Sequence, residues 1–464
     1  MRLAVPSIQS TSSPPLFNGS SPHPRVPPPH GRYGRHLSKE QVAELVAPPP
    51  DVLELVHAWL GHHGVLPSTI STTRGGSWLV LSDVPVPRAN DILNASYQLY
   101  QHIGTNKTVL RTLNYGLPAV LLSHVQTVAP TTHFGLPLSP RPTPLVPPSG
   151  EAEASENATL EERETAPLSS RITPSLLRWQ YQTLGYVPAA MHRNVLGVVG
   201  FLDEYPSPDD LSLFMSRYRT DGDFGTFTLV NVHGGGYDAN KPGPEASQNI
   251  QYTAAMTYPT PLEFYSTGGD SGTDVTYSSQ HDSFINWLYY ALSRADVPQT
   301  ITISYGYVER EIPPDYAIYV CDLFAELGLR GASVLVSTGD DGVGAGQCLV
   351  TDRSGNEYVR FLPSFPSTCT CDTFFFLCMK VVHKHEYRPL THVVHSFAGP
   401  WVTSVGGTMG FYPEKAADLS GGGFSDYFPR PGYQDYAVPA FLQEFNGLYY
   451  GLYYGLYKCV VCYQ

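Results

Sequence analysis

Apolar and polar residues follow two different spacings along this chain, and the spacings divide it into segments. Between residues 32 and 135 the pattern is mixed. Ser38 and Gln41 have the types and spacing of a helix capping box, and apolar residues at helical intervals follow them. We therefore expect a small α+β domain over residues 32–135. Its other expected elements are helices over residues 51–60 and 88–102 and a strand over residues 78–81.

From residue 172 onward, short continuous apolar runs alternate with helical patterns. Such alternation is typical of a buried parallel sheet covered by helices, so we expect an α/β domain over residues 172–464. In such sheets the functional side chains lie at the carboxyl ends of the strands. The expected strands are residues 195–201, 227–232, 301–304 and 334–337, with a helix beginning at residue 208 and another over residues 315–327.

Four stretches fit neither pattern. Residues 1–31 are rich in Pro and Ser and are expected to be disordered. Residues 136–171 pass from a proline-rich to an acidic composition that cannot bury a core, so we expect a linker that contains the cleavage region. Residues 370–399 interrupt the order of strands and helices, and we interpret them as an insertion, namely a retained intron kept in frame. Residues 458–464 are interpreted as an aberrant tail.

Composition narrows the functional classes. Of the 464 residues 42% are hydrophobic, which is enough for a sizeable core, and only 15% are charged. The net charge of −13 and the lack of any Lys/Arg-rich run exclude a nucleic-acid binder, because phosphate backbones select basic surfaces. The net negative charge suits either a secreted protein that works at low pH or a protein whose charge only aids its solubility.

The sequence contains conflicting evidence on whether the protein is secreted. No apolar run approaches the about 20 residues needed to span a bilayer, and the first residues lack the apolar core of a signal peptide. Asn-x-Ser/Thr sequons, in contrast, favour secretion and glycosylation. They occur at Asn18, Asn94, Asn106 and Asn157.

Seven cysteines are present, which is an odd number. Cys348 and Cys369 lie in sequence of globular composition. They are expected either to form a disulfide in an oxidising compartment or to remain as buried thiols.

One group of residues has the pattern of a catalytic site. Glu245 and Asn249 follow Pro244, which suits the first turn of a helix, and their spacing places both side chains on one helix face. Asp340 follows a predicted strand, where a carboxylate can point into a cleft.

These residues resemble motifs of the sedolisin family of serine-carboxyl peptidases. The helix sequence beginning at Glu245 is similar to the family's E-A-x-L-D-x-Q, and the strand end around Asp340 is similar to S-G-D-S-G. Tyr33 to Ser38 is similar to the Y-G-K-H-L-S of the family propeptide. The resemblance covers about residues 33–135 and 172–446. Further similar runs are Ser304–Gly306, Val402–Thr408 and Gly421–Pro431.

The resemblance implies a secreted, acid-acting serine-type peptidase, made as a zymogen, with a subtilisin-like fold and a bound calcium. It implies a peptide or protein substrate, a propeptide that acts as intramolecular inhibitor, and a monomer. Glu245 falls on the family's general base and Asp340 on the acid of the oxyanion hole. Carboxylates suit such a site, because histidine is protonated in acid and no longer accepts a proton.

The sequence departs from the family in three ways. Asn249 occupies the position of the second catalytic carboxylate, and an amide cannot share or relay a proton. No G-T-S-A-S, the motif of the family's serine nucleophile, occurs in the 464 residues. The calcium-binding loops of the family lie near or beyond that motif, so their ligands are not expected in this chain. We expect these 464 residues to be inactive, with a peptide-binding pseudopeptidase as the alternative interpretation.

Overall fold

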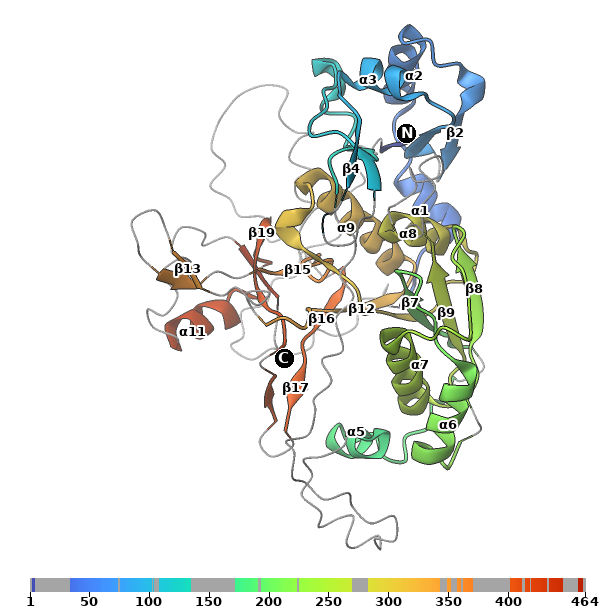
Figure 1. Ribbon diagram of the computed structural model, residues 1–464, viewed down its shortest axis with the longest axis vertical. Coiled ribbons are helices and arrows are strands. Elements are labelled where there is room, and N and C mark those ends of the chain that lie inside the picture. Colours follow the sequence, from blue (N-terminus) through green and yellow to red (C-terminus); the bar gives the residue numbers. More distant parts are fainter. Residues whose placement is uncertain are drawn as a thin grey trace, which may run out of the picture.

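The chain folds into an N-terminal domain that lies on top of a larger domain built around a parallel sheet (Figure 1). The computed structural model describes residues 2–4, 34–73, 76–101, 103, 108–134, 172–190, 193–222, 225–268, 283–342, 349–351, 357–359, 362–369, 401–410, 414–417, 419–431, 434–444 and 458–461.

The sheet of the larger domain has six parallel strands in the order β16-β12-β10-β7-β9-β8. It confirms the predicted α/β class and the four predicted strands to within a residue or two at each end. The strands are β7 (Leu196–Gly200), β8 (Thr228–Val232), β9 (Leu262–Thr267), β10 (Thr300–Ile303), β12 (Ser333–Ser337) and β16 (Thr403–Val405).

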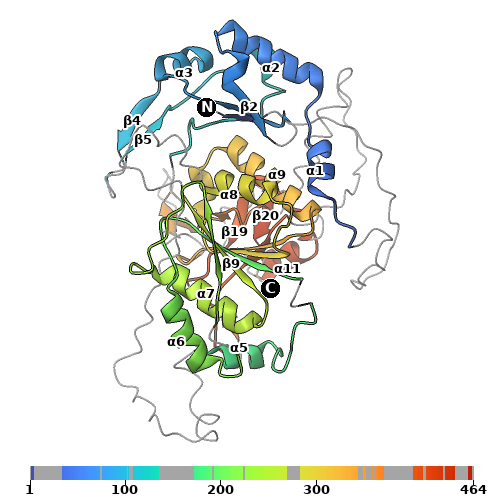
Figure 2. The same cartoon turned by 90° about the vertical axis from the view of Figure 1, so that its right-hand side faces the viewer.

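Helices cover both faces of this sheet. One face packs on α8 (Ser283–Ser293) and α9 (Pro314–Leu329), and the other packs on α6 (Pro208–Tyr218) and α7 (Pro244–Thr257), as Figure 2 shows. Val198 and Val199 are both fully buried, one in each of the two cores, because successive strand residues point to opposite faces. This two-sided burial explains why the strands read as continuous apolar runs.

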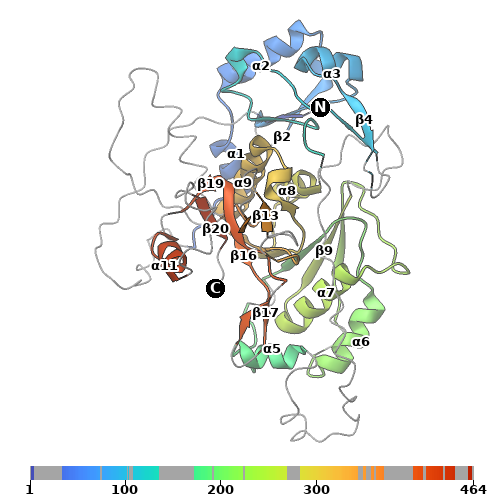
Figure 3. The ribbon, with the colours of Figure 1, turned by 60° about the vertical axis from the view of Figure 1, so that its left-hand side comes forward.

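Smaller elements surround the sheet. In Figure 3, α5 lies at the foot of the molecule, close to β17. These elements are α5 (Pro174–Gln180), β11 (Tyr307–Val308), β13 (Leu349–Thr351), β14 (Glu357–Val359), β15 (Ser364–Phe365), β17 (Thr408–Met409), β18 (Lys415–Ala416), β19 (Gly423–Pro429), α11 (Ala437–Glu444) and β20 (Lys458–Val461). Strand β20 pairs with β19, so the segment interpreted as an aberrant tail contributes a strand.

The N-terminal domain packs helices on a four-stranded sheet of order β2-β3-β1-β6. The predicted capping box is confirmed, because Ser38 Oγ accepts from the Gln41 amide and Gln41 Oε1 accepts from the Ser38 amide. The elements are β1 (Arg2–Ala4), α1 (Lys39–Leu45), α2 (Pro50–His62), β2 (Ile70–Thr73), β3 (Trp78–Leu81), α3 (Val86–Leu93), β4 (Gln98–Gln101), β5 (Thr108–Arg111) and β6 (Thr127–Ala129).

Two expectations for this domain are wrong. The helix expected over residues 88–102 ends at Leu93, because Asn94 adopts a left-handed conformation with φ of 44° and caps it. Residues 98–101 then form β4, which pairs with β5. The start of the chain is not wholly irregular either, since residues 2–4 pair with both β3 and β6 and so satisfy their backbone groups in the middle of the sheet.

The disulfide links Cys321 to Cys369, not Cys348 to Cys369 as expected. Cys321 lies on α9 and Cys369 follows β15, and both residues are fully buried. Neither spacing nor periodicity indicates this pair, because Cys321 lies within the apolar pattern of the helix. Cys348 lies outside the described residues.

The expected insertion, residues 370–399, lies outside the described residues, but its two flanks lie side by side. The Trp401 amide donates to the Cys369 carbonyl at 3.2 Å. If residues 370–399 were removed, Pro400 alone would separate these two residues. A bond from residue i+2 to residue i is that of an inverse γ-turn, whose central φ of about −75° suits proline.

We therefore expect a chain with residues 370–399 deleted to fold with the same disulfide and a thermal unfolding midpoint within a few degrees of the parent's. Differential scanning calorimetry and peptide mapping of the Cys321–Cys369 link are the measurements. A control deletion of equal length that removes residues 283–312 takes away α8 and β10 and should not fold. Loss of cooperative unfolding after the first deletion would show that the segment belongs to the fold.

Candidate active site

The predicted site residues lie at the carboxyl ends of the central strands, where the strand order reverses. The chain passes from β7 outward to β8 and back through β9, and then crosses to β10 on the other side of β7. Such a switch point leaves a crevice between neighbouring strand ends, which is the usual site of ligand binding in α/β sheets. The loops after β7, β10 and β12 and the first turns of α7 meet at this edge.

Helix α7 carries Glu245 and Asn249. It begins after Gly243, with Pro244 at its first position, where the missing amide hydrogen costs nothing. Glu245 is only 5% exposed. One turn later, Asn249 Oδ1 accepts a hydrogen bond of 3.1 Å from Ser304 Oγ, at the end of β10. This bond fixes α7 against the sheet edge.

Burial is the main influence on the Glu245 carboxyl group, and it raises the pKa to about 7. The charges of Asp340 and Glu204 raise the pKa further, whereas hydrogen bonds from Asn249 and Ser304 lower it. A carboxyl group with this pKa holds its proton through most of the acid range. All four neighbours are near enough to act on it, which places them in one cluster.

Asp340 reaches this cluster from the turn after β12. Gly339 has a φ of 95°, which favours glycine, and the turn is held by a bond of 2.8 Å from the Gly421 amide to the Gly339 carbonyl. Burial raises the pKa of Asp340, and the neighbouring Asp341 adds to the effect. Asp340 is therefore more readily protonated than an exposed aspartate.

The structure brings together all three residues selected from the sequence and adds three that were missed as site residues: Glu204, Ser304 and Tyr305. Ser304 and Tyr305 directly follow β10, and Glu204 follows β7. The rule that strand ends carry functional side chains would have selected them if it had been applied to every strand.

The resemblance implies a bound calcium, although its ligands are not expected in these 464 residues. In the part of the chain that the structure describes, no three His, Cys, Asp or Glu side chains lie close enough together to hold a metal ion. Calcium requires six to eight oxygen ligands, several of them carboxylates. The described residues therefore do not form the calcium site that the family implies.

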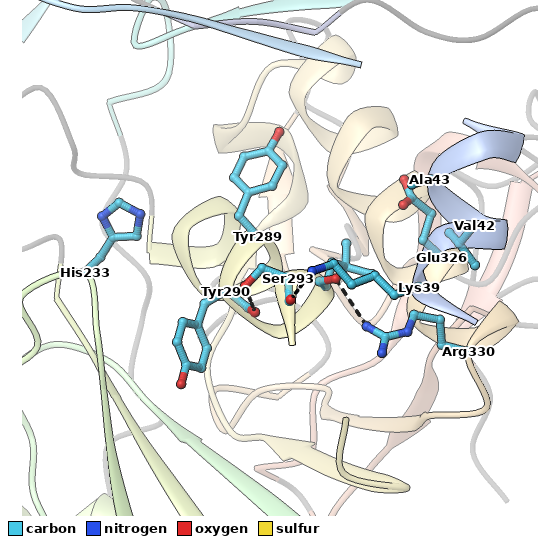
Figure 4. A pocket seen from close by; sticks show the side chains of 10 residues that line it. Lys39, Val42, Ala43, His233, Tyr289, Tyr290, Ser293, Glu326 and Arg330 are labelled. Carbon is cyan, nitrogen blue, oxygen red and sulfur yellow. Dashed lines mark hydrogen bonds between the residues drawn. The ribbon is translucent and has the colours of Figure 1, made fainter. Parts of the chain in front are cut away.

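A cavity of about 360 Å³ lies away from these carboxyl groups, between α1 and the helices α8 and α9 (Figure 4). Lys39 crosses it and donates to the Ser293 carbonyl at 2.6 Å, and Arg330 donates to the Leu292 carbonyl at 3.2 Å. None of Glu245, Asn249 and Asp340 lines it. It is a gap in the seam between the two domains and not the candidate active site.

The seam itself holds the N-terminal domain on α8 and α9. The indole of Trp78 stacks on the ring of Tyr319, with centroids 4.9 Å apart. Asp315 accepts hydrogen bonds from Tyr115 and Thr127 at 3.0 and 2.9 Å. The two domains thus share buried aromatic and hydrogen-bonding contacts.

The fold and the site define an α/β protein with an acid cluster at the switch point of its sheet and a second domain docked on its helices. Comparisons identify the family. The model for the Pro-kumamolisin activation domain matches residues 26–134. Tripeptidyl-peptidase SED2 of Arthroderma otae is 32% identical over 436 residues, covering 91% of this chain and 67% of that protein. Tripeptidyl-peptidase SED3 of the same organism is 30% identical over 438 residues, covering 91% and 66%.

The chain belongs to the sedolisin family of serine-type peptidases, and its fold is subtilisin-like. Its N-terminal domain is the activation domain of a zymogen. A Pseudomonas sedolisin, described as a serine-carboxyl proteinase complexed with two molecules of pseudo-iodotyrostatin, aligns with a TM-score of 0.37 at 18% identity, covering 58% of this chain and 67% of that one. No helix within the described residues has the length and apolar character to cross a membrane.

The hydrogen bond from Asn249 lowers the pKa of Glu245, so we expect Asn249→Ala to raise it above about 7. The pH dependence of carbodiimide labelling at Glu245, read by peptide mass spectrometry, measures the midpoint because the reagent modifies the protonated carboxyl. Asn240→Ala, in an exposed loop, is the matched control and should leave the midpoint unchanged. An unchanged or lower midpoint in Asn249→Ala would contradict the assignment of this hydrogen bond.

Proposed function

We propose that the chain is the precursor of a secreted, acid-acting peptidase that removes tripeptides from free N-termini or cuts chains internally. Glu245 is the general base and Asp340 is the acid of the oxyanion hole. The observation that carries the proposal is the burial of the Glu245 carboxyl group beside Asp340 at the switch point of the sheet. The resemblance of the relatives, which are named tripeptidyl-peptidases, supports the substrate class.

The chemistry assigns a separate task to each acid. A serine hydroxyl attacks a peptide carbonyl only when a base takes its proton, which is the task of the ionised form of Glu245. With a pKa of about 7 this form is the minor one in acid, so we propose that hydrogen bonds from the serine and the substrate in a complete site lower the pKa of Glu245 into the working range. The carbonyl oxygen becomes an oxyanion, and a protonated Asp340 donates a hydrogen bond to it, as a neutral aspartic acid does in other oxyanion holes. The raised pKa of Asp340 favours the protonated form in acid.

Asn249 occupies the position of a second acid, and the 464 residues contain no G-T-S-A-S turn. The amide positions Glu245 but takes up no proton. We infer that the chain of 464 residues is inactive until a nucleophile is supplied. A bound calcium, glycosylation at the sequons and a monomeric state are parts of the same proposal, supported only by the family.

The propeptide domain, proposed over residues 32–135, acts as the intramolecular inhibitor, and the linker over residues 136–171 contains the cleavage region. Residues 172–464 are proposed as the peptidase domain, which is incomplete without a serine turn. Within it, residues 370–399 are proposed as a retained intron, which the adjacency of Cys369 and Trp401 supports.

The same assignments predict an activity difference. We expect the purified 464-residue chain to release no peptide from a protein substrate at pH 4. A longer chain that continues into a G-T-S-A-S turn, recovered by transcript sequencing, should release peptides. In that chain Glu245→Gln should lower kcat/KM by about 10²- to 10⁴-fold, the usual contribution of a general base. Asp203→Asn, in the loop after β7, is the control.

Failure of the longer, correctly folded chain to hydrolyse peptides would refute the peptidase. Binding of substrate peptides without hydrolysis would instead support the alternative, a pseudopeptidase, which the amide at Asn249 favours.

A second prediction concerns the docking of the activation domain. His133 packs its ring against Tyr307 and Tyr316 of the peptidase domain, with centroids 4.9 and 4.7 Å away. Its Nε2 is buried without a hydrogen-bond partner among the described residues. Burial lowers the pKa of His133 to about 3, and the Arg111 guanidinium, which donates to the His133 carbonyl, adds to the effect.

The sign of the pH effect follows from this pKa. The undocked imidazole takes up a proton near pH 6.5, whereas the docked one does so near pH 3. By itself, the titration of His133 weakens docking as the pH falls from about 6.5 toward 3, by at most about 1.4 kcal/mol per pH unit. Asp322 opposes this trend, because burial raises its pKa to about 7 and its protonated form suits the docked state.

We expect His133→Phe, which keeps an aromatic ring and removes the titration, to extend docking to lower pH. Hydrogen exchange of residues 34–134 between pH 7 and pH 3 is the measurement. His63→Phe, directly after α2 and away from the seam, is the matched control. An identical pH profile for parent and His133→Phe would exclude His133 as the source of the acid weakening.

A further inference from the structure

The loop after β7 holds a half-buried glutamate, Glu204, that neither the sequence motifs nor the proposed mechanism uses. Glu204 Oε2 has no hydrogen-bond partner among the described residues, although it is shielded from solvent. A buried carboxylate oxygen without a partner is costly, so its presence at a site calls for a reason.

Its position is built by the backbone. Residues 201–204 form a turn closed by the Glu204 amide and the Phe201 carbonyl at 3.2 Å. Leu202 and Asp203 have φ values of 61° and 57°, the left-handed region that non-glycine residues rarely adopt. Strain of this kind persists where the surrounding structure enforces it, and it is concentrated at functional sites.

The turn aims Glu204 at the first turn of α7. A Cβ atom at position 243 would lie 2.7 Å from Glu204 Oε2, so only glycine fits there. The Gly243 amide donates to the Tyr205 carbonyl at 2.9 Å, and Tyr205 forms an isolated parallel bridge with Pro242. Glu204 thereby lies against Gly243, which precedes Glu245 by two residues in the sequence.

A buried tyrosine lies near the two acids. Tyr305 is fully buried, and its hydroxyl interacts with the backbone of Phe201, in the turn that carries Glu204. Both Glu204 and Glu245 raise the pKa of Tyr305, which places its ring within reach of both carboxyl groups. Glu204, Tyr305 and Glu245 thus belong to one polar cluster at the strand ends, where a proton can be shared.

We infer that Glu204 is a positioning residue of this site and, together with Tyr305, replaces the second acid that Asn249 does not provide. The inference rests on the proposed function, because it assigns Glu204 to the general base. In this chain the acid that shares the proton of Glu245 comes from the loop after β7 and not from the next turn of α7.

The experiment uses the full chain and needs no hydrolysis. The pH midpoint of carbodiimide labelling at Glu245 is measured in the parent, in Glu204→Gln and in Asp203→Asn. Removal of a neighbouring like charge should lower the midpoint of Glu245 by about one pH unit in Glu204→Gln. Asp203→Asn keeps a residue that tolerates the left-handed conformation, and it should match the parent.

A double variant that moves the acid from position 204 to position 249 tests the inference more strictly. If Glu204 replaces the missing acid, then Glu204→Gln combined with Asn249→Asp should restore the parental midpoint. Circular dichroism and thermal unfolding of each variant show that it is folded.

A midpoint in Glu204→Gln equal to that of the parent would overturn the inference, and so would a double variant that stays at the value of Glu204→Gln. A parental midpoint near 4.5 would instead refute Glu245 as the buried base, whatever Glu204 does. Failure of the inference and failure of the proposed function are thereby distinguished.

Discussion

The parallel pairing of β7 with β10 is the constraint on which the active site depends. Thr300 lies opposite Leu196 and Ile303 opposite Val199, so both strands end at the same level. This register places Ser304 and Tyr305 beside the loop that carries Glu204. A shift of one residue would turn the buried side chains of β10 to the other face of the sheet and remove the hydrogen bond between Ser304 and Asn249.

The same register links the sheet to the activation domain. The upper face of the sheet packs on α8 and α9, and the activation domain packs on the other side of those helices. Trp78 is buried with the residues of this face in one continuous core, although it belongs to β3 of the activation domain. The activation domain therefore completes the hydrophobic core of the peptidase domain, and its release must expose the ring of Tyr319.

Periodicity predicted the sheet well because its strands are buried on both faces and its helices begin with clear signals. Ser207, for example, caps α6 one residue before Pro208. The same method failed at Asn94, where a single left-handed residue ended a helix whose apolar pattern continued. It could not pair Cys321 with Cys369, because the pairing depends on how α9 packs against the chain after β15. At the site, motifs located Glu245, Asn249 and Asp340, whereas Glu204 lies outside every motif and could have been selected only by its place after β7.

Three contacts explain how the sheet tolerates the long segment between Cys369 and Trp401. The disulfide fixes Cys369 to α9, and the Trp401 amide bonds to the Cys369 carbonyl. Ser404 Oγ then donates to the Ser367 carbonyl at 2.5 Å, so this bond also joins the two flanks of the segment. Because the two flanks are held independently of residues 370–399, the pairing of β16 with β12 does not depend on what the segment does. Asp340, which directly follows β12, keeps its position for the same reason.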